Sequence, residues 1–406
     1  MMMATDELAT YRADVQGWID ANFPKSLTGR GAELLGAGAG REPLPDDMQL
    51  WVRRLGERGF GAPTWPTEFG GAGLNGAQSH VLADELNKAG AFNPIPYLTG
   101  MGVTMVGPTI LEYGTDEQKR QHLPSIANGS IRWCLGLSEP NAGSDLASLT
   151  TRAQDHGDTW VINGQKVWTS GADISQWCGA LVRTDASASK RDGISFLLLP
   201  MDQPGVRTRP IPLIAGASPF CETFFTDARA AKSDLLGPLN KGWTVVKRLL
   251  QHERASQTGT RSAGGVKEER FQDMAKRYLG VDESGRLADA DLRARLTVHL
   301  MDSKAHALTA ARIVAEAKGK VEVSAAASIL KNSATAVAQT RAELTLELMG
   351  NQGLGWEGAR FAQDELTAVR NWLSGKAMSI YGGSFEVQNN IIAKNILGLP
   401  ETTQKG

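Results

Sequence analysis

The sequence predicts an α+β fold that is mainly α. It divides into a helical domain at residues 1–129, a middle antiparallel β-barrel or sandwich at 130–235, and a C-terminal four-helix bundle at 236–406. Near both ends of the chain, apolar residues recur every three to four positions, as they do on amphipathic helices. The middle instead has short apolar runs separated by turn dipeptides. A length of 406 residues also exceeds one ordinary core, so several parts are expected.

The N-terminal part is predicted to be helical from residue 6 to about 128. Its first helix is marked by apolar side chains at helical spacing, namely Leu8, Tyr11, Val15, Trp18 and Ile19. A second such run contains Leu50, Trp51 and Leu55. Residues 62–73 are rich in proline and glycine, which do not continue a helix, so this stretch is expected to be a rigid loop.

The middle part is predicted to be a small β domain. Strand-like runs occur at 159–162, 178–182, 194–199 and 222–225. Turn dipeptides such as Asn163-Gly164 and Asp192-Gly193 separate them. Because no helices intervene between these runs, antiparallel pairing is expected.

Helical periodicity returns after Gly242 and continues toward the C-terminus. The predicted helices cover 245–257, 292–318, 323–349 and 361–380. Residues 325–338 are rich in alanine, which has high helix propensity and lets helices approach closely. These helices form the predicted four-helix bundle.

Composition excludes several classes of function. There are 43 basic and 44 acidic side chains and no long basic run, so we expect no nucleic-acid partner. The three cysteines are odd in number and widely spaced, which favours reduced thiols, and no metal-binding spacing of His or Cys occurs. No apolar run approaches the ~20 residues of a membrane span, and no signal peptide is recognisable, so a cytoplasmic protein is expected.

The stretch at 133–171 is the strongest candidate for a ligand site. It combines short β runs with tight Gly, Pro and Asn turns, small hydroxyl side chains and the aromatic Trp168. This mixture suits a flat polar ligand. We interpret the stretch as a shelf for a flavin.

A carboxylate falls on the apolar side of the helix that begins near Gly242. The apolar stripe comprises Trp243, Val246, Leu249 and Leu250, and the same spacing places Glu253 on it. Burial raises the proton affinity of a carboxylate, which makes it a usable general base near neutral pH. A structural carboxylate neutralised by Arg254 is the alternative, and this helix alone favours it.

Six segments resemble the acyl-CoA dehydrogenase family in order and approximate spacing. They are residues 65–71, 138–145, 163–168, 224–227, 240–243 and 381–399. The resemblance implies the fold of that family, FAD as cofactor, and oxidation of an acyl-CoA thioester to the trans-2-enoyl-CoA. The FAD contacts that it implies are Leu135, Leu137, Ser138, Ser144, Trp168, Ser170, Ser384 and Glu386. The implied acyl-CoA contacts are Ser144, Gln251, Arg254 and Gly382.

The chain departs from the family pattern at its usual catalytic glutamate. Most members carry that residue directly after the tyrosine of the C-terminal motif, but here Gly382 follows Tyr381. A minority carry it on the first helix after the β domain, immediately before an arginine, and Glu253-Arg254 matches that position. The resemblance therefore identifies Glu253 as the expected base. The small Gly382 suits a bulky, branched or steroid side-chain acyl group.

The second departure concerns the part of the FAD site that each family subunit lends to its neighbour. Residues 276–280 and 347–351 match the two corresponding motifs poorly, and Glu347 adds a negative charge. The resemblance thus implies a homo- or hetero-tetramer with a related acyl-CoA dehydrogenase subunit, and an electron-transfer flavoprotein as acceptor. Two alternatives stay open: a non-catalytic subunit that completes the flavin site of a partner, and a flavin oxidase or monooxygenase on the same fold.

Overall fold

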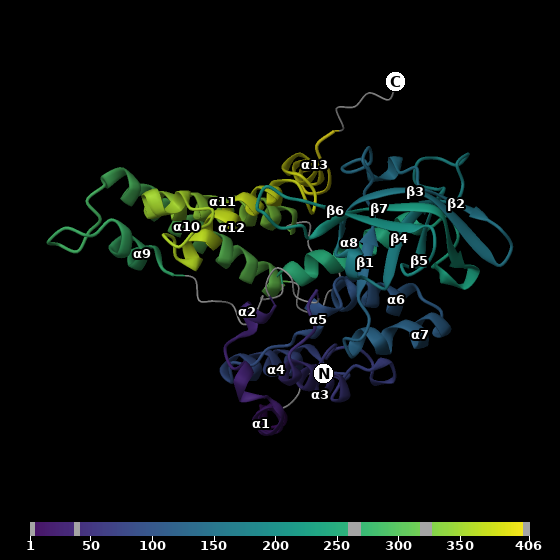
Figure 1. Ribbon diagram of the computed structural model, residues 1–406, viewed down its shortest axis with the longest axis horizontal. Helices are drawn as coiled ribbons and strands as arrows, with labels where there is room; N and C mark the ends of the chain where they lie inside the picture. The colour runs from purple at the N-terminus through teal and green to yellow at the C-terminus, as the bar shows by residue number, and fades with distance from the viewer. Residues whose placement is uncertain (1–4, 36–40, 259–268, 317–326, 401–406) are drawn as a thin grey trace. The chain divides into compact units, whose positions relative to one another are not determined.

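The computed structural model describes residues 5–35, 41–258, 269–316 and 327–400. The chain forms two compact units (Figure 1). The first comprises Met1–Ile211 and Ser218–Val266, and the second comprises Pro212–Ala217 and Lys267–Gly406. The predicted order of a helical part, a sheet and a second helical part is confirmed.

The N-terminal part of the first unit is helical. Its helices are α1 (Thr5–Asn22), α2 (Gly31–Leu34), α3 (Asp46–Glu57), α4 (Gly76–Lys88), α5 (Ile95–Leu98), α6 (Gly107–Tyr113) and α7 (Asp116–Ala127). Helices α1 to α5 pack around a core of their own, whereas α6 and α7 contribute to the core of the sheet. The fully buried Trp51 lies in the core of α1 to α5, and its indole Nε1 donates to the carbonyl oxygen of Phe92 at 2.7 Å. Capping boxes begin α4 at Asn75 and α7 at Thr115, and they satisfy backbone N–H groups that a helix start leaves open.

An eight-stranded sheet follows α7. Its strands are β1 (Trp133–Gly136), β2 (Arg152–Asp155), β3 (Thr159–Ser170), β4 (Trp177–Arg183), β5 (Ile194–Pro200), β6 (Val206–Ile211), β7 (Phe220–Ala231) and β8 (Leu235–Leu236). The strand order is β6-β7-β3-β2-β4-β5-β8, and β1 pairs with β4.

The sheet differs in two respects from the antiparallel barrel or sandwich that the sequence predicts. It does not close, because within the described residues β6 and β8 end the path without pairing with each other. It is also mixed, since β1 and β2 both pair with β4 in parallel. The short strand β1, which follows α7 in the sequence, pairs with β4 in parallel. Turn dipeptides predict only antiparallel hairpins between neighbouring strands, so they do not indicate this pairing.

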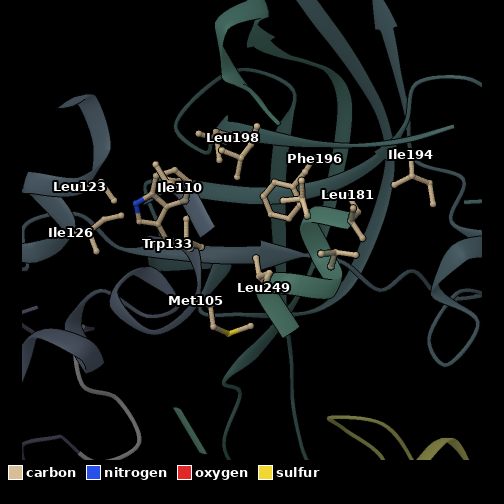
Figure 2. Packing of buried hydrophobic residues seen from close by; sticks show 14 of the residues in the cluster. Met105, Ile110, Leu123, Ile126, Trp133, Leu181, Ile194, Phe196, Leu198 and Leu249 are labelled. Atoms are coloured by element: carbon tan, nitrogen blue, oxygen red, sulfur yellow. The ribbon is translucent and has the colours of Figure 1, made fainter. Parts of the chain in front are cut away.

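One hydrophobic core joins the sheet to the helices on both sides of it in sequence. Figure 2 shows Ile110 and Leu123 from the helices before the sheet, Trp133 and Phe196 from the sheet, and Leu249 from the helix after it. The last of these residues belongs to α8 (Gly242–Thr258), which therefore packs on the sheet and on α6 within the first unit. The first residue of this helix, Gly242, lies so close to β5 that no side chain fits there. A Cβ at this position would lie 2.4 Å from the backbone carbon of Ser195.

The second unit contains the remaining helices. They are α9 (Phe271–Tyr278), α10 (Ala290–Glu316), α11 (Ala327–Met349), α12 (Gln363–Gly375) and α13 (Phe385–Asn395). Phe271, Leu292, Leu344 and Leu348 belong to the core between α9, α10 and α11. The domain boundaries near residues 129 and 235 stay a prediction, and compactness groups α8 with the sheet.

Candidate functional site

A hollow of about 300 Å³ lies in the first unit and is lined by residues from the sheet, from α8 and from the segment after α5. Its lining residues are Met101, Thr104, Met105, Leu135, Leu137, Ser138, Val167, Trp168, Ser170, Leu250 and Glu253. The structure thus brings together five of the predicted FAD contacts and the predicted base. Specific ligand pockets commonly have about this volume or more.

Trp168 is turned into an unusual orientation by its backbone. Its φ of 60° lies in the left-handed region, which a tryptophan rarely adopts. The pairing of β3 with β7 shifts register between Lys166 and Thr169, so β3 carries a bulge at this point. The indole is 55% exposed and its edge meets the ring of Phe220 at 6.0 Å between centroids. A strained aromatic residue beside a hollow is typical of a ligand site.

The backbone at Leu137 and Ser138 is held by two consecutive residues of β3. The Val167 N–H donates to the Ser138 carbonyl oxygen at 2.9 Å. The Lys166 ammonium donates to the Leu137 carbonyl oxygen at 3.0 Å. These bonds replace the pairing of β1, which ends at Gly136.

Lys166 and Glu139 form a buried ion pair below this segment. The Lys166 side chain is completely buried, and its Nζ lies 2.9 Å from Glu139 Oε1. The Thr151 N–H also donates to Oε1, and the N–H and hydroxyl of Thr150 both donate to Oε2. Although burial raises it, the pKa of Glu139 falls to about 2 because Lys166 and these donors favour the carboxylate. Burial lowers the pKa of Lys166, and Glu139 opposes that shift.

Helix α8 places Glu253 at the hollow. Val246 and Leu249 are buried in the core, and Leu250 and Glu253 lie half-buried on the wall. The predicted apolar stripe is therefore the side of the helix that faces the sheet. Because the helix is anchored there, Glu253 is held on the wall of the hollow.

Another side of α8 carries a polar network. Arg248 donates to both carboxylate oxygens of Glu112 on α6 at 2.7 Å and to Gln251 Oε1 at 2.9 Å. Glu112 also lies 3.2 Å from His252 Nε2. Burial lowers the pKa of His252, and the charge of Glu112 opposes that shift. Gln251, a predicted substrate contact, thus lies in this network, whereas the side chain of Arg254 lies outside the described residues.

Met101, Thr104 and Met105 also line the hollow, although no motif in the sequence indicates them. Thr104 and Met105 belong to a π-helical turn at Gly102–Val106, and Met101 directly precedes it. The Val106 N–H donates to the carbonyl oxygen of Met101 at 2.9 Å. Such wide turns are rare in proteins as a whole, and many of those that occur lie at functional sites. Gly107, which follows the turn, packs directly on the indole of Trp65. A Cβ at Gly107 would lie 2.0 Å from Trp65 Cη2, so no larger residue fits there. The loop at 62–73 thus supports this wall.

Ser144 does not line the hollow. It is exposed in the loop between the bridge that pairs Glu139 with Ala142 and a short helix at Leu146–Ser148. Glu139, before this loop, pairs with Lys166 of β3, and Asp145 within it pairs with Lys190 in the connection between β4 and β5. Ser144 stays a predicted contact for cofactor and substrate.

Gly382, Ser384 and Glu386 belong to the second unit. Gly382 and Gly383 have φ values of 66° and 90°, which favour glycine over any other residue. The side-chain amide of Gln388 donates to the Gly382 carbonyl oxygen at 2.7 Å, and Ser384 caps α13 by accepting from the Val387 N–H. A bond from Ser384 lowers the pKa of the exposed Glu386. The left-handed φ of Gly382 therefore favours glycine at this turn.

The residues at the poorly matched half-site have partners within the second unit. Arg295 Nη1 donates to Glu347 Oε2 at 2.7 Å, and Arg295 Nε donates to Asp291. Arg295 lowers the pKa of Glu347 through this bond. At the end of α9, Tyr278 donates to Glu365 at 3.0 Å and Arg277 donates to Asp364 at 2.8 Å.

In the part of the chain that the structure describes, no group of three or more His, Cys, Asp or Glu side chains is arranged to hold a metal ion. Within the same residues, no helix has the length and apolarity that crossing a membrane requires.

The fold and the sequence match the models of three successive domains. The N-terminal, middle and C-terminal domains of acyl-CoA dehydrogenase match residues 39–130, 134–228 and 240–397. The chain belongs to the acyl-CoA dehydrogenase family of oxidoreductases.

Individual relatives cover nearly the whole chain. The chain is 37% identical to the acyl-CoA dehydrogenase IpdE1 of Mycobacterium tuberculosis, covering 97% of this chain and 98% of the relative. The solved structure described as the Tcur3481-Tcur3483 steroid ACAD is 28% identical to this chain, with a TM-score of 0.75. The match covers 98% of this chain and 99% of the chain in that structure. The ChsE4-ChsE5 complex from Mycobacterium tuberculosis is 26% identical with a TM-score of 0.72, covering 99% and 100%.

Proposed function

We propose that this chain catalyses the FAD-dependent α,β-dehydrogenation of an acyl-CoA thioester to the trans-2-enoyl-CoA, with Glu253 as the base. One observation carries the proposal: Glu253 and five predicted flavin contacts line the same hollow. A carboxylate is the group that this reaction needs beside the redox cofactor, because a proton must leave the carbon α to the thioester carbonyl.

The residues of the hollow suit a flavin. Trp168 offers an exposed aromatic ring, and Ser138 and Ser170 offer hydroxyl groups to the polar edge of a flat ring system. Leu135 and Leu137 supply apolar contacts on the same wall. FAD, when bound, supplies the acceptor for the hydride that leaves the β carbon.

Within this scheme, Glu253 takes the α proton of the substrate. Its helix is fixed by Val246 and Leu249 in the core, so the carboxylate is held in place before substrate binds. Ser144, Gln251, Arg254 and Gly382 are the proposed substrate contacts, and Ser384 and Glu386 are proposed to complete the cofactor site. These six assignments rest on the motif positions.

We propose a bulky, branched or steroid side-chain acyl group as substrate. The solved relative described as a steroid ACAD supports this class. The hollow supports it as well, because Met101 and Met105 are flexible side chains that adapt to irregular apolar groups. Gly382 adds no side-chain volume of its own, and no atom lies within 4 Å of the position where its Cβ would be.

The decisive experiment measures anaerobic bleaching of the flavin by a panel of straight, branched, aromatic and steroid CoA esters. Replacement of Glu253 by Gln should slow bleaching by about 10²- to 10⁴-fold while the flavin stays bound, because the amide accepts no proton. Glu117→Gln, at an exposed position of α7, is the matched control. Bleaching by Glu253→Gln at the parental rate would remove Glu253 from the mechanism.

We further propose a tetramer that includes a related acyl-CoA dehydrogenase subunit, and an electron-transfer flavoprotein as electron acceptor. The solved ChsE4-ChsE5 complex supports a heteromer. Helix α10 also exposes Val298, Met301 and Leu308 at helical spacing, with 56%, 65% and 58% of their surfaces exposed. Exposed apolar side chains that recur on one side of a helix are typical of protein interaction surfaces.

Two measurements test the assembly and the acceptor. Size-exclusion chromatography and flavin content are compared for the chain expressed alone and with a related subunit, and a fully flavinated, active homotetramer would refute the heteromer. Reoxidation of the reduced protein should be faster with an electron-transfer flavoprotein than with oxygen. The reverse order would favour a flavin oxidase.

A further inference from the structure

A buried ion pair lies directly behind the wall that carries Leu137 and Ser138. Lys166 is completely buried and Glu139 is 6% exposed. Burying two charges is costly unless their remaining hydrogen-bonding positions are satisfied. Glu139 meets this condition, since four donors from Lys166, Thr150 and Thr151 share its two oxygens.

The ammonium of Lys166 has a second acceptor, and that acceptor belongs to the wall. It donates to the Leu137 carbonyl oxygen at 3.0 Å, one residue beyond the end of β1. The next residue of β3, Val167, donates its N–H to the carbonyl oxygen of Ser138 at 2.9 Å. The two carbonyl groups are therefore fixed by neighbouring residues of one strand.

The path of the lysine to this position depends on a glycine. A Cβ at Gly136 would lie 3.2 Å from Lys166 Cγ and 3.2 Å from Cys178 Sγ. The aliphatic stem of Lys166 thus passes over the one residue of β1 that has no side chain. Strand β3 then bulges after Lys166, and the bulge presents Trp168 to the same hollow.

We propose that Lys166 and Glu139 are positioning residues for the flavin. The charged pair fixes the Leu137-Ser138 backbone against β3, and so sets the distance between the Ser138 side of the hollow and Trp168. Neither residue lines the hollow, so both act through the residues that do. This inference rests on the proposed function, because flavin is the ligand whose seating it describes.

The test compares FAD affinity and the visible circular dichroism of bound FAD, using the assembly in which the parent protein retains FAD. The main variant is the double substitution Lys166→Met and Glu139→Gln, which removes both charges together and is therefore expected to fold. It should bind FAD at least about tenfold more weakly, the factor that one charge-assisted hydrogen bond is worth. Its visible circular dichroism should change, because the ring is seated differently.

The control is the exposed pair of Arg30 and Glu33 in the same compact unit. Arg30 Nη2 lies 2.6 Å from Glu33 Oε1, and the two side chains are 46% and 63% exposed. Arg30→Met with Glu33→Gln should leave FAD affinity and the flavin spectrum unchanged. Parental affinity and spectrum in the Lys166 and Glu139 double variant would overturn the inference, even if its thermal unfolding midpoint falls.

A second variant decides the question if the double variant does not fold. Gly136→Ala keeps both charges but displaces the stem of Lys166, so it should also weaken FAD binding and alter the visible spectrum. A Gly136→Ala protein with parental FAD affinity and spectrum would overturn the inference. A parent protein that retains no FAD in any assembly would instead refute the proposed function itself, before any variant is compared.

Discussion

The histidine at position 122 allows a quantitative prediction about stability and pH. His122 on α7 is 2% exposed and packs edge-on against two tryptophans. Its ring centroid lies 5.2 Å from that of Trp133 and 4.6 Å from that of Trp177. Among the described residues, its Nε2 has no hydrogen-bond partner. Burial in these surroundings lowers the pKa of His122 from 6.5 to about 4.

The direction of the effect follows from proton binding. Between pH 6.5 and about 4, the unfolded chain binds a proton at His122 and the folded chain does not. The stability that the neutral ring provides is therefore complete above pH 6.5 and is lost as pH falls toward 4. One pKa unit corresponds to about 1.4 kcal/mol, so the full loss is about 3 kcal/mol, of which about 2 kcal/mol is reached at pH 5.

His122→Phe should remove this contribution. The ring keeps its shape and apolar contacts, so the free energy of unfolding at pH 7.5 should change by less than about 1.5 kcal/mol. Between pH 7.5 and pH 5, the variant should lose about 2 kcal/mol less than the parent. Urea unfolding followed by tryptophan fluorescence measures both values.

His80→Gln is the matched control, because His80 is exposed on α4. It should leave the pH dependence of the parent unchanged. The reasoning is wrong if His122→Phe loses as much stability as the parent between the two pH values. In that case the folded protein would bind a proton at His122 as readily as the unfolded chain does.

Three further predictions concern two glycine positions and the tryptophan that lines the hollow. Gly107→Ala should lower the free energy of unfolding by about 1–3 kcal/mol, because its Cβ would meet Trp65 at 2.0 Å. Gly17→Ala on α1, with no atom within 4 Å, should leave the thermal unfolding midpoint equal or higher. Gly382→Ala should cost about 1–2 kcal/mol because φ is 66° there, whereas Gly375→Ala, in open space at the end of α12, should cost less than half of that. A smaller loss for Gly382→Ala than for Gly375→Ala in thermal unfolding would contradict this reasoning. Trp168→Gly should relieve the left-handed φ and weaken FAD binding up to about tenfold, measured by flavin fluorescence, and parental affinity would count against a stacking role.

The position of Glu253 on α8 was predictable because residues three or four positions apart lie on the same side of a helix. The residues Val246, Leu249 and Leu250 recur at three- and four-residue intervals, and the same intervals reach Glu253. The structure has Val246 and Leu249 in the core and Glu253 at the hollow. The residues of α8 alone therefore suffice to predict which side of the helix carries Glu253.

The topology of the sheet was not predictable in the same way. Strand β1 has four residues, too few to show a clear alternation, and it pairs with a strand about 40 residues later. Turn dipeptides indicate only pairings between neighbours. The parallel pairing of β1 with β4 is a property of the assembled core, in which Trp133 and Trp177 stack.

A signal for Lys166 was nevertheless present in the sequence. Lys166 lies an even number of residues after Trp160 and Ile162, which are buried in β3, so regular alternation places it on their face. A lysine on the core face of a strand requires a partner. The partner Glu139 lies 27 residues earlier, and only the fold identifies it.

The compact unit that carries the hollow also contains α8, so the proposed base belongs to the same unit as the proposed flavin wall. The apolar stripe of α10 belongs to the other unit. Substitutions confined to Val298, Met301 and Leu308 would therefore change the surface proposed for subunit pairing while leaving intact the unit that carries the proposed base and flavin wall.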